Sequence, residues 1–497
     1  MPINTLHPEY VFRQNDWTAA RDAIAGETAV KQKRDTYLPV PPGMSTGSNE
    51  VLENGKRVAG DRYSFYLSFA EFPELIAPAV NGYQGMIHGN DAHVELPENL
   101  EYLRDDATPE GETLDTVWER STQEILSAGR IGYLCDIGGD DRIRTVLYSA
   151  EHILNWRLMT RREGGGPSFV VLREVAKEPE EDDPFKMREV VYFRELRVMD
   201  GVYRSRLWRQ DKKNGKPEVM AQEGVGADGW VTPMLFGRTF PFIPFMVQNA
   251  TERGFHYEPI PIMALVRRAL SIYRLTADYK RSLYIKGDPQ VVISGITQDQ
   301  APTKIGGDSI WTLPNPQARA EYLDIDGDGI PLVRQAITDE YERFYQEGGR
   351  LLDTADRGAE SGEALRRRQV ANQVSLRTIA MNTGEGLELL LKKIADYMGE
   401  DPGVVKFRPD LDFSEPVMTG RDLLEFQTAR AQGAPMSART LHELMRRGRV
   451  TNLTFEQEQD EMRTDPGLVS GLPDAGDAFS EEDATVRTEA ASSSVDG

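Results

Sequence analysis

Three aspartates in a short stretch raise the possibility of calcium binding. In YLDIDGDGIPLVRQ, Asp324, Asp326 and Asp328 occupy positions 1, 3 and 5 of an EF-hand loop, and Gly329 stands at position 6. Position 12 should be a bidentate glutamate, but here it is Gln335, and a strand-like run precedes the stretch where an EF-hand has a helix. The residues instead predict a turn leading into a helix, with the acids near its positive N-terminus.

Two other groups of residues resemble reactive sites. GMSTG fits the G-x-S-x-G pattern of a nucleophile elbow around Ser45, but that elbow follows a strand, and here the chain PVPP precedes it. His88, Asp91 and His93 lie close together in HGNDAH, which reads as an exposed loop rather than a metal site. The sequence contains no G-x-x-x-x-G-K-[ST], no HExxH and no CxxC. We therefore expect a protein that is not an enzyme, with no catalytic residues, bound metal or cofactor.

Composition limits the possible partners. The 497 residues carry a formal net charge of −22, so the protein as a whole should not coat itself with DNA or anionic lipid. The single cysteine, Cys135, lies in an apolar strand-like run and reads as a small core residue of a protein folded in a reducing cytosol. The longest apolar run contains Arg238 and three prolines, which excludes a membrane-spanning helix there.

The elements of the first half alternate in type. A short helical start and a Pro/Gly/Ser-rich loop precede a helical reading from residue 62 to 89. A further helix at about 112–128 ends at Gly129, and RIGYLCDI and RIRTVLYS then form two strands joined by a GGDD turn. Residues 169–235 predict an antiparallel meander with a turn at Asn214-Gly215.

Two strongly periodic helices flank a small strand-rich insert in the second half. The first spans 262–286, with Pro289 stopping it, and the second begins at Pro331. Between them, QVVISG, DSIWTL and AEYLDI read as short strands. A long helix over 363–398 follows, with a kink predicted at Gly384 and Gly386, and then strand-like residues and a helical segment at 420–465.

Basic residues gather on these helices. The first helix carries Arg267, Arg274 and Arg281 at seven-residue spacing, and Arg366–Arg368 begin the long helix. They read either as a solvated face with interhelical ion pairs or as a surface that meets phosphates. The apolar stripes of the two helices exceed what one helical hairpin can bury against itself, which predicts neighbouring subunits and a closed ring.

The order of these segments resembles the portal proteins of tailed bacteriophages. WERSTQEILSAGRIGYLCDI is similar to the opening of the portal wing, and YSAEHILNWR to a strand leading into an Ile-x-x-Trp-Arg turn. PIMALVRRALSIYRLTADYKRSLYIKGDPQVVISG resembles the first stem helix running into the clip. GGRLLDTADRGAESGEALRRR looks like the tunnel loop and the start of the long wing helix. The resemblance covers about residues 60 to 465.

The resemblance implies an α+β, portal-like fold: an antiparallel-sheet wing, long stem helices flanking a strand-rich clip, a kinked long wing helix, a helical crown and a disordered acidic tail. The domains it implies are an N-terminal arm (1–60), wing (61–260), stem helix (261–287), clip (288–330), second stem helix (331–347), tunnel loop (348–362), long wing helix and strands (363–415), crown (416–465) and tail (466–497).

The same resemblance implies a function and partners. Portals form a ring, dodecameric in this family, at one capsid vertex of the virion, assembled in the host cytoplasm. Double-stranded DNA enters and leaves through the channel, and the large terminase, a head–tail adaptor, and capsid and scaffold proteins bind the ring. The alternatives are another virion component, such as a connector ring or minor capsid protein, and a hydrolase. Candidate DNA contacts in the tunnel loop are Arg350, Asp353, Asp356, Arg357 and Glu360.

Overall fold

The computed structural model divides the chain into two compact units, residues 1–411 and 412–497. The residues that it describes are 2–42, 44, 61–138, 140, 142–160, 166–180, 183, 185–210, 215–220, 228–287, 290–297, 316–323, 327–348, 362–411, 420–434, 437–447, 450–451 and 453–464. Helices and strands are mixed, and every strand pair among these residues is antiparallel, as the α+β class predicts.

The first unit begins with helices. They are α1 (Pro8–Ala25), α2 (Glu27–Gln32), α3 (Asp61–Phe69), α4 (Ile76–Ile87) and α5 (Leu114–Ala128). Helix α5 agrees with the predicted span: Thr113 caps its N-terminus, and Gly129 adopts φ 79° at its C-cap. The continuous helix predicted from residue 62 to 89 is wrong, because the chain leaves the helix between α3 and α4, where Pro73 stands.

A three-stranded sheet lies beside α5 and holds the predicted hairpin. Strands β2 (Arg130–Ile137) and β3 (Ile143–Ser149) pair directly, and Cys135 is buried in β2, where burial raises the pKa of its thiol to about 12. The third strand, β11 (Phe245–Asn249), pairs with β2 from far along the chain. Sequence periodicity gave no sign of that pairing.

The predicted meander is a five-stranded sheet with the order β4-β5-β6-β7-β8, confirmed by the structure. Its strands are β4 (Ile153–Leu158), β5 (Pro167–Pro179), β6 (Met187–Met199), β7 (Val202–Gln210) and β8 (Pro217–Val219). The same unit also contains smaller pairs in the described residues: β1 (His93–Glu95) with β14 (Lys406–Arg408), β9 (Met234–Leu235) with β10 (Arg238–Thr239), and a hairpin in the second half described below.

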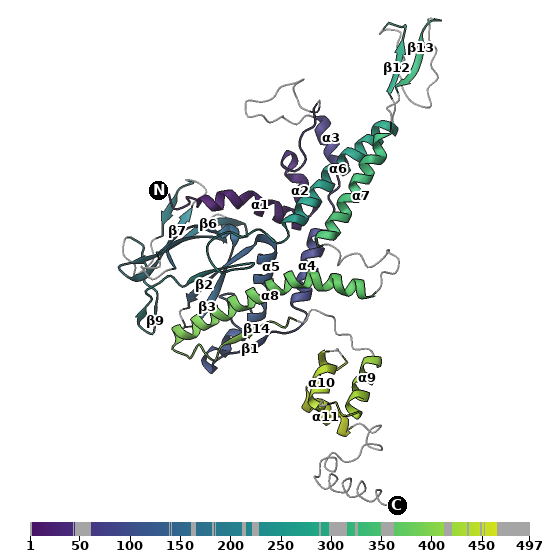
Figure 1. Ribbon diagram of the computed structural model, residues 1–497. Coiled ribbons are helices and arrows are strands. Elements are labelled where there is room, and N and C mark those ends of the chain that lie inside the picture. The colour runs from purple at the N-terminus through teal and green to yellow at the C-terminus, as the bar shows by residue number, and fades with distance from the viewer. Residues whose placement is uncertain are drawn as a thin grey trace, which may run out of the picture. The chain divides into compact units, whose positions relative to one another are not determined.

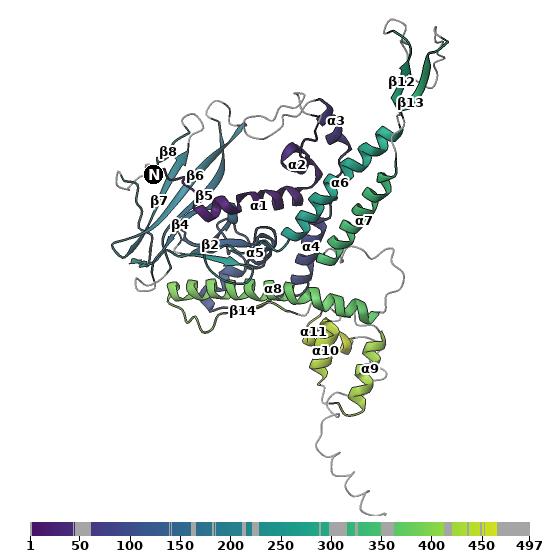
Figure 2. The same ribbon diagram turned by 45° about the horizontal axis from the view of Figure 1, so that its top comes forward.

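The helix-insert-helix pattern of the second half is also present. Helix α6 (Met263–Gly287) leads into β12 (Gln290–Ser294), which pairs with β13 (Arg319–Leu323), and α7 (Gly329–Glu347) follows. Figures 1 and 2 show α6 and α7 side by side, with the β12–β13 hairpin at their far end. The predicted strand at DSIWTL lies outside the described residues.

Helix α8 (Gly362–Met398) is one 37-residue helix that changes direction part-way along its length in both views (Figures 1 and 2). Its two glycines are positions of close approach. A Cβ on Gly384 would lie 2.4 Å from Pro409 Cδ, and one on Gly386 would lie 2.4 Å from Gln248 Oε1. Only glycine lets the two neighbours come this near to the helix backbone.

The N-terminal residues are part of the core of the first unit. Trp17 of α1 is 1% exposed, and its indole Nε1 donates a hydrogen bond of 3.0 Å to the Ala128 carbonyl at the end of α5. Arg21 ion-pairs with Glu124 of α5 at 2.6 Å. Residues 8–25 therefore pack against α5, a contact that the sequence did not suggest.

The second unit contains three described helices, α9 (Gly420–Ala431), α10 (Ala438–Arg447) and α11 (Phe455–Thr464), as the helical reading of 420–465 predicts. His442 of α10 is buried with its ring 5.4 Å from that of Phe455. The tail predicted to be disordered, 466–497, lies outside the described residues.

Candidate functional site

The two helices α6 and α7 are buried by the rest of the unit to different extents. Eight residues of α6 are buried, all within its first fifteen positions: Met263, Leu265, Val266, Ala269, Leu270, Ile272, Tyr273 and Ala277. Helix α7 has 19 residues and buries one, Phe344. The rest of α7 is half-buried or exposed, and Leu332 at its start is 72% exposed.

Ion pairs fix the two helices in antiparallel register. Arg268 of α6 contacts Glu340 at 3.3 Å and Glu347 at 2.8 Å, and Glu340 also pairs with Arg343 within α7 at 3.0 Å. The hydrogen bonds to Glu347 raise the pKa of the Arg268 guanidinium. Because Arg268 lies near the start of α6 and Glu347 ends α7, the pairs join the end of the helix pair opposite the β12–β13 hairpin.

The three arginines of the predicted basic face have different surroundings in the structure. Arg267 is exposed. Arg274 donates from Nε to the Tyr37 carbonyl at 2.7 Å, and the Arg281 guanidinium lies over the Tyr66 ring, 5.8 Å from its centroid. Arg274 and Arg281 therefore hold the N-terminal segment against α6. Contact between this basic face and DNA stays a prediction.

After the C-terminal end of α7 the chain is held at Gly348, the first residue of the predicted tunnel loop (348–362). Gly348 is buried with φ 146°, and its carbonyl accepts a hydrogen bond from the Tyr83 hydroxyl of α4. Burial raises the pKa of Tyr83 to about 12, which keeps the hydroxyl a donor. The predicted loop residues Arg350, Asp353, Asp356, Arg357 and Glu360 lie outside the described residues.

The opposite end of the helix pair is apolar and exposed. Tyr284 is 47% exposed, and its ring packs 5.2 Å from Phe65 and 5.3 Å from Phe69 of α3. Near it in the chain, Leu283 of α6 and Val292 of β12 are 44% and 47% exposed. Such side chains, close to the hairpin, are typical of a surface that binds another chain.

The residues first considered for metal or nucleophilic chemistry do not form a site where the structure describes them. Asp328 holds the N-cap position of α7 without a side-chain capping hydrogen bond, and Gln335 donates to Asp339 at 2.7 Å. Asp324, Asp326 and Ser45 lie outside the described residues. The described side chains include no cluster of three or more His, Cys, Asp or Glu placed for a metal.

The reading of HGNDAH as an exposed loop is wrong for His88. This residue is the C-cap of α4, with its ring 4.1 Å from that of Trp118, and burial lowers the pKa of its imidazole to about 4. His93 is exposed in β1 and pairs with Glu95 at 2.9 Å. The two histidines thus serve separate elements, because packing on α5 draws only His88 inward.

Sequence reasoning missed a pocket on the five-stranded sheet. Here Glu195 is 1% exposed and accepts hydrogen bonds from Arg197 at 2.6 Å, Arg206 at 2.7 Å and Trp208 at 2.9 Å. The Arg206 guanidinium lies between two indoles, 4.6 Å from the Trp208 ring and 4.3 Å from the Trp230 ring. The pocket could have been found from the alternation of side chains along the strands, which places Glu195, Arg206 and Trp208 on one face of the sheet.

Comparison with known proteins gives one family match and several structural likenesses, two of which are described below. A family model described as "Domain of unknown function (DUF4055)" matches residues 261–398, which span α6, the hairpin, α7 and α8. This is less than half of the chain. No curated protein matches the sequence. Among the described helices, none has the length and apolar character needed to cross a membrane.

Two of the similar solved structures are neck assemblies. A chain of the "Neck of native GTA particle computed with C12 symmetry" aligns with a TM-score of 0.39 and 11% identity, covering 84% of this chain and 99% of that one. A chain of the "Neck of empty GTA particle computed with C6 symmetry" aligns with a TM-score of 0.38 and 10% identity, covering 75% and 90%. Because both TM-scores are below 0.5, the proposals below rest on the chain's own elements.

Proposed function

We propose that this chain is the subunit of a phage portal: a ring at one capsid vertex of a virion, through which double-stranded DNA is packaged and ejected. The observation that carries the proposal is the paired helices α6 and α7 with the β12–β13 hairpin at their far end, next to an antiparallel sheet domain. This arrangement has the form of the stem and clip that the motif order implies.

The uneven covering of the helix pair supports a ring. Helix α7 buries Phe344 alone, while α6 buries eight residues against the same unit. A long amphipathic helix that is left largely open in the subunit gains stability when it packs against neighbouring copies. Repeated head-to-tail contacts of this kind close into a ring when the rotation between subunits divides a full turn.

The charge supports passage of DNA rather than its capture. With a net charge of −22, the protein repels the phosphate backbone, so DNA in a central channel would slide without being held. We propose a purely structural role, in which terminase bound at the clip end supplies the work. The exposed apolar residues beside the hairpin are the surface proposed for that partner or for a head–tail adaptor.

The test is imaging of the purified protein by negative-stain electron microscopy, with native mass spectrometry over a range of salt and protein concentrations. We expect closed rings with a central hole, and a virion with this chain at a single vertex. Monomers under all conditions would overturn the proposal. If the chain forms rings in virions but virions lacking it still package their genome, the chain would instead be a head–tail connector.

A further inference from the structure

Strands β5 and β6 carry two unusual features at opposite ends. Past the end of β5, the chain EPEEDDPFKM contains four consecutive acids at 180–183, and then Phe185, whose side chain is 93% exposed. Met187, the first residue of β6, is 57% exposed. We call Glu180, Asp183, Phe185 and Met187 the hairpin tip. Phe185 and Met187 thus place two exposed apolar side chains beside acids, a combination that suits contact with another chain.

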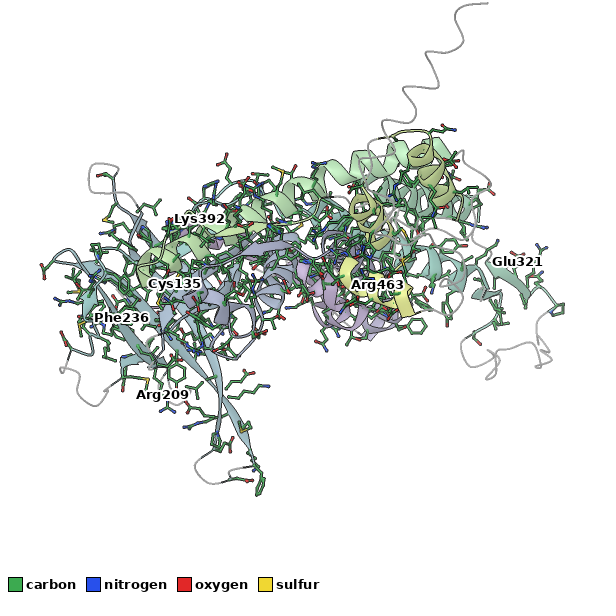
Figure 3. The ribbon with its side chains drawn as sticks, turned by 90° about the horizontal axis from the view of Figure 1, so that it is seen from below. Cys135, Arg209, Phe236, Glu321, Lys392 and Arg463 are labelled. Carbon is green, nitrogen blue, oxygen red and sulfur yellow. The ribbon has the colours of Figure 1, made fainter. Side chains whose placement is uncertain are left out.

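The hairpin tip stands away from the rest of the sheet. Strand β7 ends its pairing with β6 at Val191, and β4 ends its pairing with β5 at Leu172. Among the described residues, therefore, no further strand pairs with the last rungs, from Ala176–Val190 to Pro179–Met187. Figure 3 shows the paired strands running on past the labelled Arg209. Glu178 near the tip is held by Arg209 at 2.7 Å, which stiffens this two-stranded extension.

The opposite end of the same strands forms the sheet pocket, with a volume of about 550 Å³. Its aromatic walls are Trp156, Phe169 and Trp208, and Thr5 and Asn155 lie at its border. Its charged residues are three arginines and one glutamate (Arg157, Arg197, Arg206 and Glu195), a net charge of +2 in a protein of net charge −22. Glu195 is buried beneath two of the arginines, which fixes them toward the pocket.

The two features are complementary in chemistry. An aromatic ring suits a pocket lined by indole, phenyl and guanidinium groups, and acids suit its surplus of arginine. One chain cannot bring them together, because Phe169 in the pocket and Pro179 before the tip are ten residues apart on one strand, or about 33 Å. A second copy must therefore supply the tip, and a knob and a pocket at opposite ends give a head-to-tail contact.

We propose that the hairpin tip of one subunit inserts into the sheet pocket of the next, with Phe185 against Phe169 and Trp208 and the acids of the tip facing Arg157 and Arg197. This contact joins neighbouring wings around the ring, in addition to the packing between helix pairs. It rests on the proposed function, since it requires that the chains form a ring.

Disulfide trapping tests the contact directly. Cys135 is the chain's only cysteine and is buried, so introduced cysteines react alone. We expect F185C/S168C to give a ladder of covalent oligomers on a non-reducing gel, since Ser168 lines the pocket. The matched control is F185C/E218C, with the second cysteine on the edge strand β8, outside the pocket; it should stay monomeric on the same gel.

The proposed ring is tested separately from the wing contact by asking whether the same protein forms rings before oxidation. Rings of reduced F185C/S168C that give no ladder would overturn the wing contact and leave the ring intact. Reduced protein and unmodified protein that both fail to form rings would overturn the ring and the contact together. A ladder from F185C/E218C as strong as that from F185C/S168C would show chance collision and also overturn the assignment.

A second variant avoids cysteine chemistry. Phe185 contacts little of its own subunit, so F185A should fold normally and raise the concentration at which rings dissociate about tenfold, the effect of losing one buried aromatic side chain. Mass photometry over a dilution series measures the change. An unchanged dissociation concentration for F185A would overturn the insertion of Phe185.

Discussion

Helices α5 and α7 are both amphipathic, but the subunit treats them differently. Helix α5 buries nine of its 15 residues between α1, α4, α8 and the β2–β3 sheet, whereas α7 buries one of 19. The difference teaches that the α5 region contributes most to the subunit's own stability, while α7 leaves a surface that we propose packs against other chains. Substitutions in the first region should change the free energy of unfolding, and substitutions in the second should change assembly.

The largest expected effect comes from a leucine pair that contrasts the two helices. Leu126 of α5 is 1% exposed, so Leu126→Ala should lower the free energy of unfolding by about 3 kcal/mol through lost burial and a cavity. Leu332→Ala on α7, at a side chain 72% exposed, should change it by less than about 0.5 kcal/mol. Urea denaturation of dissociated subunits measures both. Equal losses would mean that α7 is also part of the subunit core.

Acid should weaken the α4–α5 contact selectively. The folded pKa of His88 is about 4, below the ordinary 6.5, so between these values the unfolded chain binds a proton that the folded chain does not. The stability that neutral His88 provides is complete above pH 6.5 and is lost as the pH falls toward 4. We expect the wild type to lose about 2 kcal/mol more than His88→Phe between pH 7 and 4.5. Parallel pH curves for the two proteins would contradict this.

Substitutions at two glycines test whether α8 is as closely packed as the α5 region. Gly384→Ala should destabilise the first unit by about 1 to 2 kcal/mol, because the new methyl group meets the rigid ring of Pro409. Gly82→Ala on α4, where no atom lies within 4 Å, should instead stabilise it by up to about 1 kcal/mol through helix propensity. Thermal melts of the two variants should shift in opposite directions.

The smallest effect concerns the ion pairs of the helix pair. Arg268→Met removes the contacts to Glu340 and Glu347, which are partly exposed, and should cost about 0.5 to 1 kcal/mol. Its matched control, Arg267→Met on the exposed side of the same helix, should cost nothing measurable. The difference between the two variants should shrink in 1 M NaCl. A loss of unfolding free energy several times larger would show that α7 contributes to the stability of the subunit as much as α5 does.

Much of the local structure could be predicted from the sequence alone. The α5 helix, the β2–β3 hairpin, the meander and the two helices around a strand-rich insert all follow from periodicity, caps and turns within neighbouring residues. The candidate site was predicted less well. Arg274 and Arg281 stand on one face as their spacing predicts, but nothing local could show that Tyr37 and Tyr66 lie against them.

What the tertiary structure alone decided are the contacts between residues distant in the chain. Strand β11 pairs with β2, Trp17 donates to the carbonyl that ends α5, and Glu195 collects Arg206 and Trp208 into a pocket. The sequence by itself determined that α5 and α7 are amphipathic helices. Which one is covered depends on the surfaces that the rest of the chain brings against it, because burial is a property of the packed neighbours and not of the pattern.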